Sequence, residues 1–494
     1  MIEPISISVS QLNLPSIMPM MVTIFGALTI LIIDLFTDKL EKSFYVMMTI
    51  LFLLIDLGVV LTYSGNPRGF FDLMLVDGIS LLSQLIILVG SGLFVLLALS
   101  QSRFHEYRYP EYFALFLFMV AGFQFMVSSD SLILIFVGIE TASMSLYTII
   151  AMHNRDKSIE AAIKYFTLGA LGASFFAFGS MILYGVSGTV ELAKMAEVFS
   201  STGFANYPYI LLGTVFIIAA LGFKLSLVPF HIWAPDVYEG SSSALAGFIS
   251  IVPKIAAFVV ALRFFEMFVN VNDIFIYYIL YFIVVVTITV PNMIALVQTD
   301  IKRMFAYSSI SHAGFALSAV LVGTTQATNG LFLYWILFLF TNLGAFAILW
   351  VHRTKKDKRF GDGHPYKKFA GLVKTSPITA SIMGLFMLSL AGIPPFSLFW
   401  GKMYLIGATI NADELLLAII MALNSAIAVY YYLKLIVYMF LKEKIEDANV
   451  VVMGNANNTL KSVIGISAIV TVSSVLFIDP LLKLIGYYVG ISGF

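Results

Sequence analysis

The feature that most constrains this chain is a series of apolar windows, each of around 20 residues, that recurs from end to end. A helix of that length crosses a hydrocarbon core about 30 Å thick. Only 11% of the 494 residues are charged, whereas soluble domains average about 25%. Most of the chain therefore cannot face water. We predict an all-α polytopic membrane protein, because a β-barrel would show alternating segments of about ten residues instead.

The apolar pattern predicts about 14 transmembrane helices. Their expected ranges are 15–36, 43–63, 76–99, 110–128, 130–151, 159–185, 208–234, 243–269, 274–298, 301–323, 327–352, 376–409, 413–441 and 460–489. No connection between these spans is long enough for a separate soluble domain.

Lysines and arginines are distributed unequally between the loops on the two sides of the membrane, and such a bias orients a membrane protein. With the N-terminus outside, 19 of the 28 lysines and arginines fall in inside loops, 3 fall outside and 6 fall within spans. This bias predicts both termini on the outer side. The 28 basic residues balance 28 acidic ones, which argues against a nucleic-acid partner. The chain has no cysteine, so cysteine-held iron–sulfur clusters, disulfides and cysteine zinc sites are excluded.

Prolines interrupt two of the expected spans. Pro229 lies in 208–234, and Pro394 with Pro395 lies in 376–409. Non-helical backbone at membrane depth needs protein or a water-filled cavity around it. The two breaks read PFHIW and PFSLFW and lie five spans apart, so they run in opposite directions. This arrangement predicts two inverted five-helix repeats, each with one broken helix.

The repeats divide the chain into four parts. We expect three N-terminal helices in 1–109, the first repeat with helices 4–8 in 110–269, the second repeat with helices 9–13 in 270–441, and helix 14 in 442–494.

Five ionisable residues stand inside the expected spans, where charge is expensive: Glu140, Lys224, Lys254, His312 and Lys402. Burial disfavours the charged form of a lysine, and a neighbouring carboxylate restores it. A lysine whose carboxylate contact changes can therefore hold or release a proton. Lysines and a histidine spaced across a bilayer predict a path for protons. Lys164, Lys434 and His231 are accessory candidates.

Each residue also has a purely structural alternative. Glu140 and Lys224 could form an ion pair that only fixes two helices, and His312 could be a satisfied core histidine. Lys164 and Lys434 could extend to the membrane interface, and Asp56 could serve a polar contact. No nucleotide loop, zinc-protease motif or Ser/His/Asp triad is found, so no cofactor-binding or metal residue is assigned.

Several stretches resemble the NuoN/NdhB branch of the antiporter-like membrane subunits of respiratory complex I (NADH:quinone oxidoreductase, NDH-1). They are GIETASMSLYTIIA (138–151), FHIWAPDVYEGSSSALAGFISIVPKIAAF (230–258), LVQTDIKRMFAYSSISHAGF (296–315), AGIPPFSLFWGKMYL (391–405) and YYYLKLIVYMF (430–440). The resemblance extends over nearly the whole chain. The related NuoM and NuoL branches carry a histidine-rich stretch after the first break, where this chain has PDVYEG.

The resemblance implies fourteen helices and proton translocation driven by quinone reduction elsewhere in the complex. By motif, Glu140 corresponds to the carboxylate of helix 5, Lys224 and Lys254 to the lysines of helices 7 and 8, and Lys402 to that of helix 12. His312 corresponds to a polar position of helix 10.

The resemblance also implies a multi-pass protein of the bacterial inner (plasma) membrane with no redox centre of its own. FMN, iron–sulfur clusters and quinone are then expected on other subunits. NuoM-, NuoK- and NuoJ-like subunits and the lipid bilayer are the expected partners.

Two other functions fit the same charged residues. One is a subunit of an Mrp-type cation/proton antiporter, which runs on ion gradients without redox chemistry. The other is a membrane scaffold that conducts nothing, in which Lys254 and Lys402 should tolerate methionine or glutamine.

Overall fold

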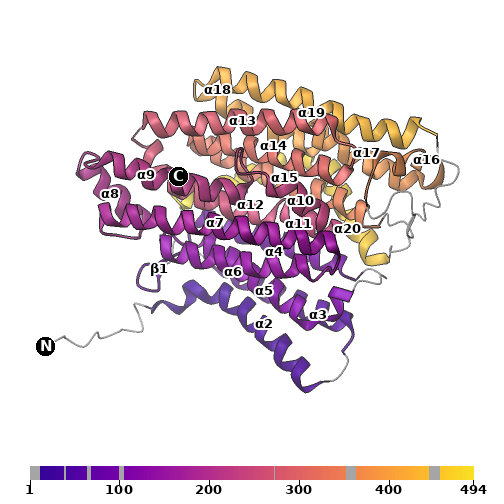
Figure 1. Cartoon of the computed structure of the whole chain (residues 1–494), viewed down its shortest axis with the longest axis horizontal. Helices are drawn as coiled ribbons and strands as arrows, with labels where there is room; N and C mark the ends of the chain where they lie inside the picture. Colours follow the sequence, from indigo (N-terminus) through magenta and orange to yellow (C-terminus); the bar gives the residue numbers. More distant parts are fainter. Residues whose placement is uncertain are drawn as a thin grey trace.

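The computed structural model describes residues 12–37, 40–63, 68–99, 105–271, 273–351, 363–443 and 457–493. Long helices lie side by side, with α2 and α3 at one edge of the bundle and α18 and α19 at the other (Figure 1). The helices that form the bundle are α2 (Met18–Phe36), α3 (Lys42–Thr62), α4 (Gly78–Leu97), α5 (Pro110–Val127), α6 (Leu132–Ala151), α7 (Asp156–Ser187), α9 (Tyr207–Leu225), α11 (Ser243–Ile249), α12 (Val252–Val269), α13 (Ile274–Val297), α14 (Ile301–Val322), α15 (Thr325–Val351), α17 (Pro377–Ala391), α18 (Ser397–Asn411), α19 (Leu415–Leu441) and α20 (Asn458–Ser473).

Short elements connect the long helices. They are the 3-10 turns η1 (Leu14–Ile17), η2 (His105–Arg108), η3 (Tyr366–Phe369) and η4 (Ser474–Leu476), the helices α8 (Leu192–Ser201), α10 (Trp233–Gly240), α16 (Leu372–Thr375) and α21 (Ile478–Ile491), and the antiparallel strands β1 (Arg68–Gly69) and β2 (Met74–Leu75).

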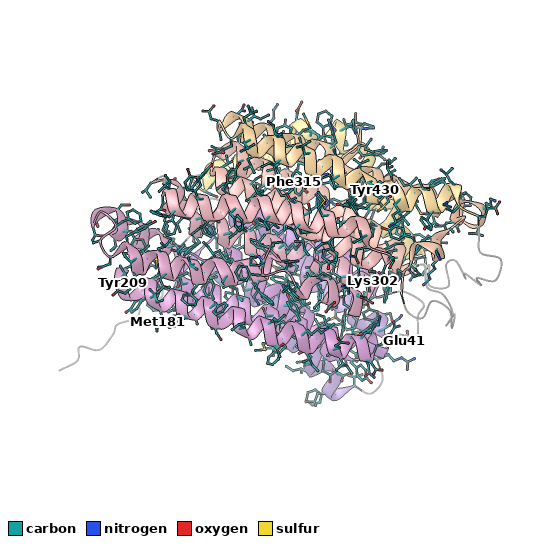
Figure 2. All side chains as sticks on the ribbon, turned by 45° about the horizontal axis from the view of Figure 1, so that its top comes forward. Glu41, Met181, Tyr209, Lys302, Phe315 and Tyr430 are labelled. Atoms are coloured by element: carbon teal, nitrogen blue, oxygen red, sulfur yellow. The ribbon has the colours of Figure 1, made fainter. Side chains whose placement is uncertain are left out.

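Among the described residues, 13 helical segments are long and apolar enough to cross a membrane. The shorter apolar helix α17, continued by α18, supplies the remaining expected span. The prediction of an all-α membrane protein with about 14 spans is thus confirmed. Figure 2 shows Lys302 and Glu41 toward one end of the bundle and Tyr209 toward the other. We call the first the Lys302 end and the second the Tyr209 end.

Local sequence explains where many helices start and stop. The side chains of Asp77, Asp273 and Asp300 accept hydrogen bonds from backbone N–H groups in the first turns of α4, α13 and α14. These contacts satisfy donors that a helix start leaves open. Gly188 and Gly323 follow α7 and α14 with φ of 71° and 62°, a backbone region that glycine enters without a steric penalty.

Both proline-containing spans are interrupted, as predicted. After α9 the backbone turns at Ser226 (φ 59°), and after α17 it turns at Gly392 (φ 82°). Each break holds a cis peptide bond, before Pro229 and before Pro395. In the first half α5 packs against α6 and α7 against α9, and in the second half α13 packs against α14 and α15 against α18. The division of the chain into inverted repeats stays a prediction.

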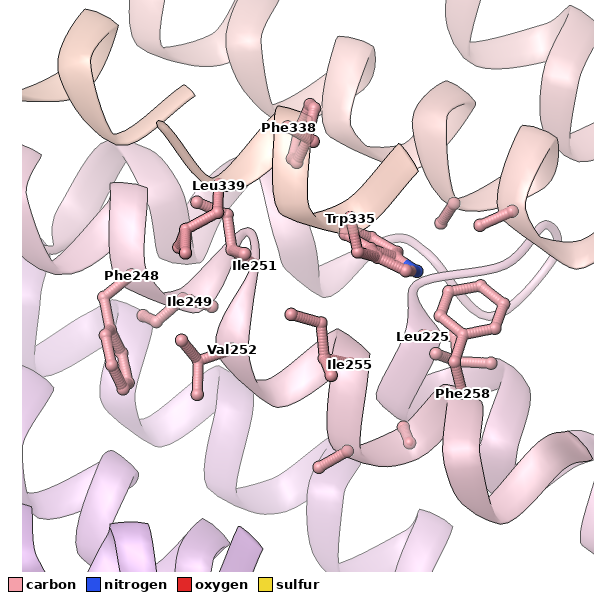
Figure 3. Packing of buried hydrophobic residues seen from close by; sticks show 14 of the residues in the cluster. Leu225, Phe248, Ile249, Ile251, Val252, Ile255, Phe258, Trp335, Phe338 and Leu339 are labelled. Carbon is pink, nitrogen blue, oxygen red and sulfur yellow. The ribbon is translucent and has the colours of Figure 1, made fainter. Parts of the chain in front are cut away.

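Apolar residues fill the centre of the bundle around α12 and α15, whose residues are almost all buried. Figure 3 shows Val252 and Ile255 of α12 in the same packed region as Trp335 and Leu339 of α15. The outer helices instead expose large apolar side chains, such as Phe282 at 64%. This distribution suits a protein whose periphery meets lipid.

The last expected span, 460–489, is not one helix. It divides into α20, η4 and α21, and the residues that qualify as a span are Asn458–Leu476. The chain bends at Phe477, whose backbone is not helical, and α21 then packs against α4 and α15. The backbone N–H of Ile79 donates to Ser492 Oγ at 2.7 Å, so the C-terminal segment is fastened to the beginning of α4.

Candidate functional site

The first break holds Lys224 in the last turn of α9. Side chains take over hydrogen bonds that the interrupted helix cannot make. Trp233 Nε1 donates to the carbonyl of Phe223 at 2.9 Å, and the backbone N–H of Val228 donates to Thr287 Oγ1 at 3.0 Å. These two bonds hold the broken segment against α9 and α13.

The amine of Lys224 donates to Ser143 Oγ at 2.6 Å. Glu140 lies one helical turn before Ser143 on α6 and is within electrostatic reach of Lys224. Among the described residues, however, Glu140 forms no ion pair with Lys224, and its Oε1 atom is buried without a hydrogen-bond partner. The structure thus places Glu140 near Lys224. The group that binds the Lys224 amine, however, is the Ser143 hydroxyl and not the Glu140 carboxylate.

Close helix packing fixes the position of this part of α6. A Cβ atom on Gly138 would lie 2.7 Å from the carbonyl oxygen of Gly122, so only glycine lets α5 and α6 approach this far.

A cavity of about 20 Å³ lies beside Lys224. Its lining includes Ser143, Tyr165 and Pro253, the residue before Lys254. A space of ~10–15 Å³ suffices for one water molecule when polar partners are present. The Lys224 amine and the Ser143 hydroxyl supply such partners. The cavity can therefore hold a water between the first break and the start of α12.

Lys254 is 1% exposed and lies in the first turn of α12. Its amine donates to both the carbonyl oxygen and the Oγ of Ser309, at 2.7 and 2.8 Å. The hydroxyl of Tyr238, from α10, lies 3.3 Å from the same Oγ. Lys254 is therefore bound to α14 through a serine, and that serine also contacts the short helix that follows the first break.

His312, which is 4% exposed, lies one turn further along α14. Its Nε2 is 3.0 Å from the hydroxyl of Tyr432, and its Nδ1 contacts the hydroxyl of Tyr334. The Tyr432 hydroxyl also contacts Ser308 Oγ. Ser308 is the neighbour of Ser309, so the contacts of Lys254 and those of His312 meet at two consecutive residues of α14.

Lys402, at 5% exposure, lies on α18 after the second break. Its amine donates to the carbonyls of Leu390 and Ala391, both at 3.2 Å, and so satisfies the open end of α17. It also lies 5.6 Å from the ring centre of Phe315, one turn from His312. Lys402 and Lys254 are both within electrostatic reach of His312.

The accessory candidates have surroundings of their own. Lys164 pairs with Glu160 at 2.6 Å and with Asp236 at 2.9 Å. Lys434 donates to the carbonyl of Gln298 at 3.1 Å. His231 lies in the first break, and its Nδ1 is buried without a partner among the described residues.

Ion pairs hold α10 at the Lys302 end. Arg303 contacts Asp236 at 3.0 Å and Glu239 at 2.8 Å, and Lys157 contacts Glu239 at 2.8 Å. Burial alone would raise the pKa of Asp236 and Glu239. Hydrogen bonds from Lys164 and Arg303 to Asp236, and from Lys157 and Arg303 to Glu239, outweigh burial and hold each pKa below its usual value. Both carboxylates are therefore charged near neutral pH.

Sequence reasoning missed the hydroxyl partners of the charged residues: Ser143, Tyr238, Ser308, Ser309, Tyr334 and Tyr432. Helical spacing carried a signal for some of them, because residues three or four apart share a face. Ser143 is three residues after Glu140, and Ser308 and Ser309 precede His312 by four and three. The part of the chain that the structure describes contains no group of three or more His, Asp or Glu suited to a metal ion.

The pattern of the NADH:quinone oxidoreductase/Mrp antiporter transmembrane family matches residues 129–428. This match covers both interrupted helices and all five ionisable residues of the candidate site.

Similar proteins indicate the branch of this family to which the chain belongs. NADH-quinone oxidoreductase subunit N of Sulfurimonas denitrificans is 57% identical over the whole of both chains, and that of Helicobacter hepaticus is 46% identical over 99% of each. A chain of respiratory complex I from Thermus thermophilus has a TM-score of 0.78 at 27% identity, covering 94% of this chain and 99% of its own. A chain of the Mrp complex from Dietzia sp. has a TM-score of 0.81 at 18% identity, covering 97% of each. The chain belongs to the subunit N branch of this family.

Proposed function

We propose that this chain translocates protons as a membrane subunit of a complex I-type NADH:quinone oxidoreductase. Quinone reduction would take place on other subunits of the same complex, which would also carry the FMN and the iron–sulfur clusters. The chain would thus be part of a redox-driven enzyme without a redox centre of its own. Relatives named subunit N over the full length of the chain support the complex, and the buried ionisable residues support the proton path.

The proposed path uses Glu140, Lys224, Lys254, His312 and Lys402. A change in the contacts of Lys224 between Ser143 and Glu140 would start a transfer. A water in the cavity beside Lys224 would carry the proton toward Lys254. His312 would receive it by way of the serine and tyrosine hydroxyls, and Lys402 would release it near the second break.

One observation carries this proposal. Two buried ionisable residues from different helices are each bonded to hydroxyl groups: Lys254 to Ser309, and His312 to Tyr432, which also contacts the adjacent Ser308. A hydroxyl donates and accepts at the same time, so it can pass a proton on without holding a charge. The two sets of contacts end on consecutive residues of α14, so the step between Ser308 and Ser309 is the one that a proton would have to cross.

The membrane location of the protein and its neighbouring subunits belong to the same proposal. We propose that the protein lies in a bacterial inner membrane with both termini, and the Tyr209 end, outside. NuoM-, NuoK- and NuoJ-like subunits are the proposed neighbours.

The test replaces Glu140 or Lys224 with alanine in the assembled complex, reconstituted in sealed vesicles. Proton pumping per electron transferred should fall in both variants while the complex still assembles. The matched control is Lys194→Ala, because Lys194 is an exposed lysine on α8 paired only with Glu191 in the described residues. Normal pumping stoichiometry in the assembled Glu140→Ala and Lys224→Ala variants would refute the proposed path.

An Mrp-type antiporter subunit is the second candidate, since the family pattern and the fold are shared with an Mrp complex. The two candidates differ in their partners. Purification of the tagged chain together with flavin- and iron–sulfur-containing subunits supports the oxidoreductase. Purification without them, together with sodium/proton exchange in vesicles, supports the antiporter.

A further inference from the structure

Asp56 is a buried carboxyl group that the proposed path does not use. It lies on α3, within the N-terminal helices, and is 0% exposed. Its Oδ2 accepts a hydrogen bond from Gln124 Nε2 at 2.7 Å. Its Oδ1 is buried and has no hydrogen-bond partner among the described residues.

Uncharged groups surround this carboxyl group. Gln124 Nε2 also lies 3.3 Å from Gln84 Oε1, and Gln84 Nε2 donates to Ser128 Oγ at 2.8 Å. Gln124 Oε1 accepts from Thr23 Oγ1 at 3.1 Å. These contacts fix the Gln124 amide so that an N–H group, rather than its oxygen, faces Asp56. Among the described residues, the surroundings supply one donor to the carboxyl group and no positive charge.

Within the described part of the chain, the helices that make the main contacts with α3 offer no cation at this depth. They are α2, α4 and α5, and their charged residues are Asp34 and Glu111, both near the opposite end of the bundle. Within α3 itself, Lys42 is 14 residues away, about 21 Å along the helix. Arg263, from α12, is engaged by Asp77 at 2.6 Å.

An ionised carboxylate without a counter-charge is very unfavourable in such surroundings, whereas a protonated carboxyl group is neutral. We propose that Asp56 is a second proton-binding site of this subunit, which exchanges its proton with water at the Tyr209 end. The site is six residues from the end of α3, about 9 Å along the helix. Uptake forms an O–H bond at Oδ1, and release returns that proton to water.

Infrared difference spectroscopy of the whole purified complex tests this proposal. The spectrum of the unmodified complex minus that of Asp56→Asn should show the carbonyl stretching band of one protonated carboxylic acid at neutral pH. The band should shift to lower frequency after transfer to D₂O, because the proton exchanges with water. Asp56→Glu keeps a carboxyl group, so it should change the frequency of the band without removing it. This variant supplies the test if the Asp56→Asn complex does not assemble.

Asp34→Asn is the matched control, since Asp34 is the aspartate of α2 and accepts from Tyr45 near the Lys302 end. It should leave the band in place. Carboxylate bands in place of the acid band would overturn the proposal. An acid band that does not shift in D₂O would also overturn it, because the carboxyl group would then be a sealed structural acid. An acid band that added Na⁺ converts to carboxylate bands would overturn it as well, because Asp56 would then be a sodium site. None of these results depends on whether the lysine path pumps protons.

Discussion

At the scale of single residues, the three lysines of the candidate site donate to groups that carry no charge. Lys224 and Lys254 each contact a serine, and Lys402 contacts two backbone carbonyls. A lysine paired with a carboxylate leaves an unpaired buried charge when it loses its proton. A lysine bound to a neutral oxygen leaves none. These partners therefore suit amines that gain and lose protons.

Ser143→Ala tests the neutral partner of Lys224. Removing a hydrogen bond to a charged group costs about 1.5–3 kcal/mol, so the amine should move toward the unpartnered Glu140. We expect the complex to assemble and its pumping rate to fall roughly tenfold, because Lys224 would be held by the carboxylate. Ser143→Thr keeps the hydroxyl and should pump nearly normally. Equal pumping by the alanine variant and the unmodified protein, measured in sealed vesicles, would exclude this role.

Tyr432→Phe tests the hydroxyl between Ser308 and His312. The variant keeps the ring but loses the oxygen that contacts both. We expect electron transfer and assembly to persist while protons pumped per electron fall several-fold. Tyr430→Phe is the control, because Tyr430 is two residues away on the outward face of α19 and is 63% exposed. If both variants pump alike, the Tyr432 hydroxyl is not on the path.

The charged residues of the site could be found from the sequence, whereas their partners could not. Glu140, Lys224 and Lys402 stand out because ionisable groups are rare in apolar spans. The rotation of each helix about its axis and its depth in the bundle decide which serine faces a lysine. Both depend on close contacts between helices, such as that between Gly122 and Gly138. The sequence marks Asp56 only as a residue that could serve a polar contact, and the lack of a cation near it among the described residues shows only in the packed helices.

At the scale of elements, the helix that follows the first break depends on ion pairs. α10 has only 8 residues, and Asp236 and Glu239 attach it to α7 and α14. Because Tyr238 of the same helix contacts Ser309, these pairs also set the surroundings of Lys254. The ion pairs at the Lys302 end thus support the buried site at a distance.

Glu239→Gln should make stability less dependent on pH. The folded-state pKa of Glu239 is below its usual 4.5, so its contribution is complete above that pH and is lost as the pH falls through the folded-state pKa. We expect the variant to lose about 1 kcal/mol near neutral pH, as for other half-exposed pairs. Thermal unfolding of the complex at several pH values measures the difference, which should shrink below about pH 4.5. If the difference in stability between the two proteins did not change with pH, the charge of Glu239 would not be its source.

Both proline breaks could be predicted from the sequence, but the division of the last span could not. Proline removes a backbone donor inside a helix, and this predicts the breaks at Pro229 and Pro395, although α13 continues through Pro291 without a break. Pro480 lies in the first turn of α21, where proline is tolerated and leaves no such signal. The bend at Phe477 depends on packing of α21 against α4 and α15, contacts that are distant in the sequence.

At the scale of the whole molecule, the loops at the two ends differ in charge. Basic residues such as Arg303 and Lys367 gather at the Lys302 end. The positive-inside rule then predicts this end on the cytoplasmic side.

Single cysteines test the orientation, since the natural chain has none. Lys194 on α8 and Lys367 on η3 are exposed at opposite ends of the bundle. We expect a membrane-impermeant maleimide to label Lys194→Cys in spheroplasts and Lys367→Cys only in inverted vesicles. The reverse pattern would place the Lys302 end outside and invert the proposed direction of proton release.

The proposed function requires that protons pass through the interior of the bundle by way of the amines of Lys224, Lys254 and Lys402. Lys254→Met tests it most directly, because methionine keeps an unbranched apolar side chain and removes the titrating group. We predict that the reconstituted complex assembles, oxidises NADH and pumps fewer protons per electron than the unmodified complex. An assembled Lys254→Met complex that pumps at the full stoichiometry would contradict the claim and leave this chain as a scaffold.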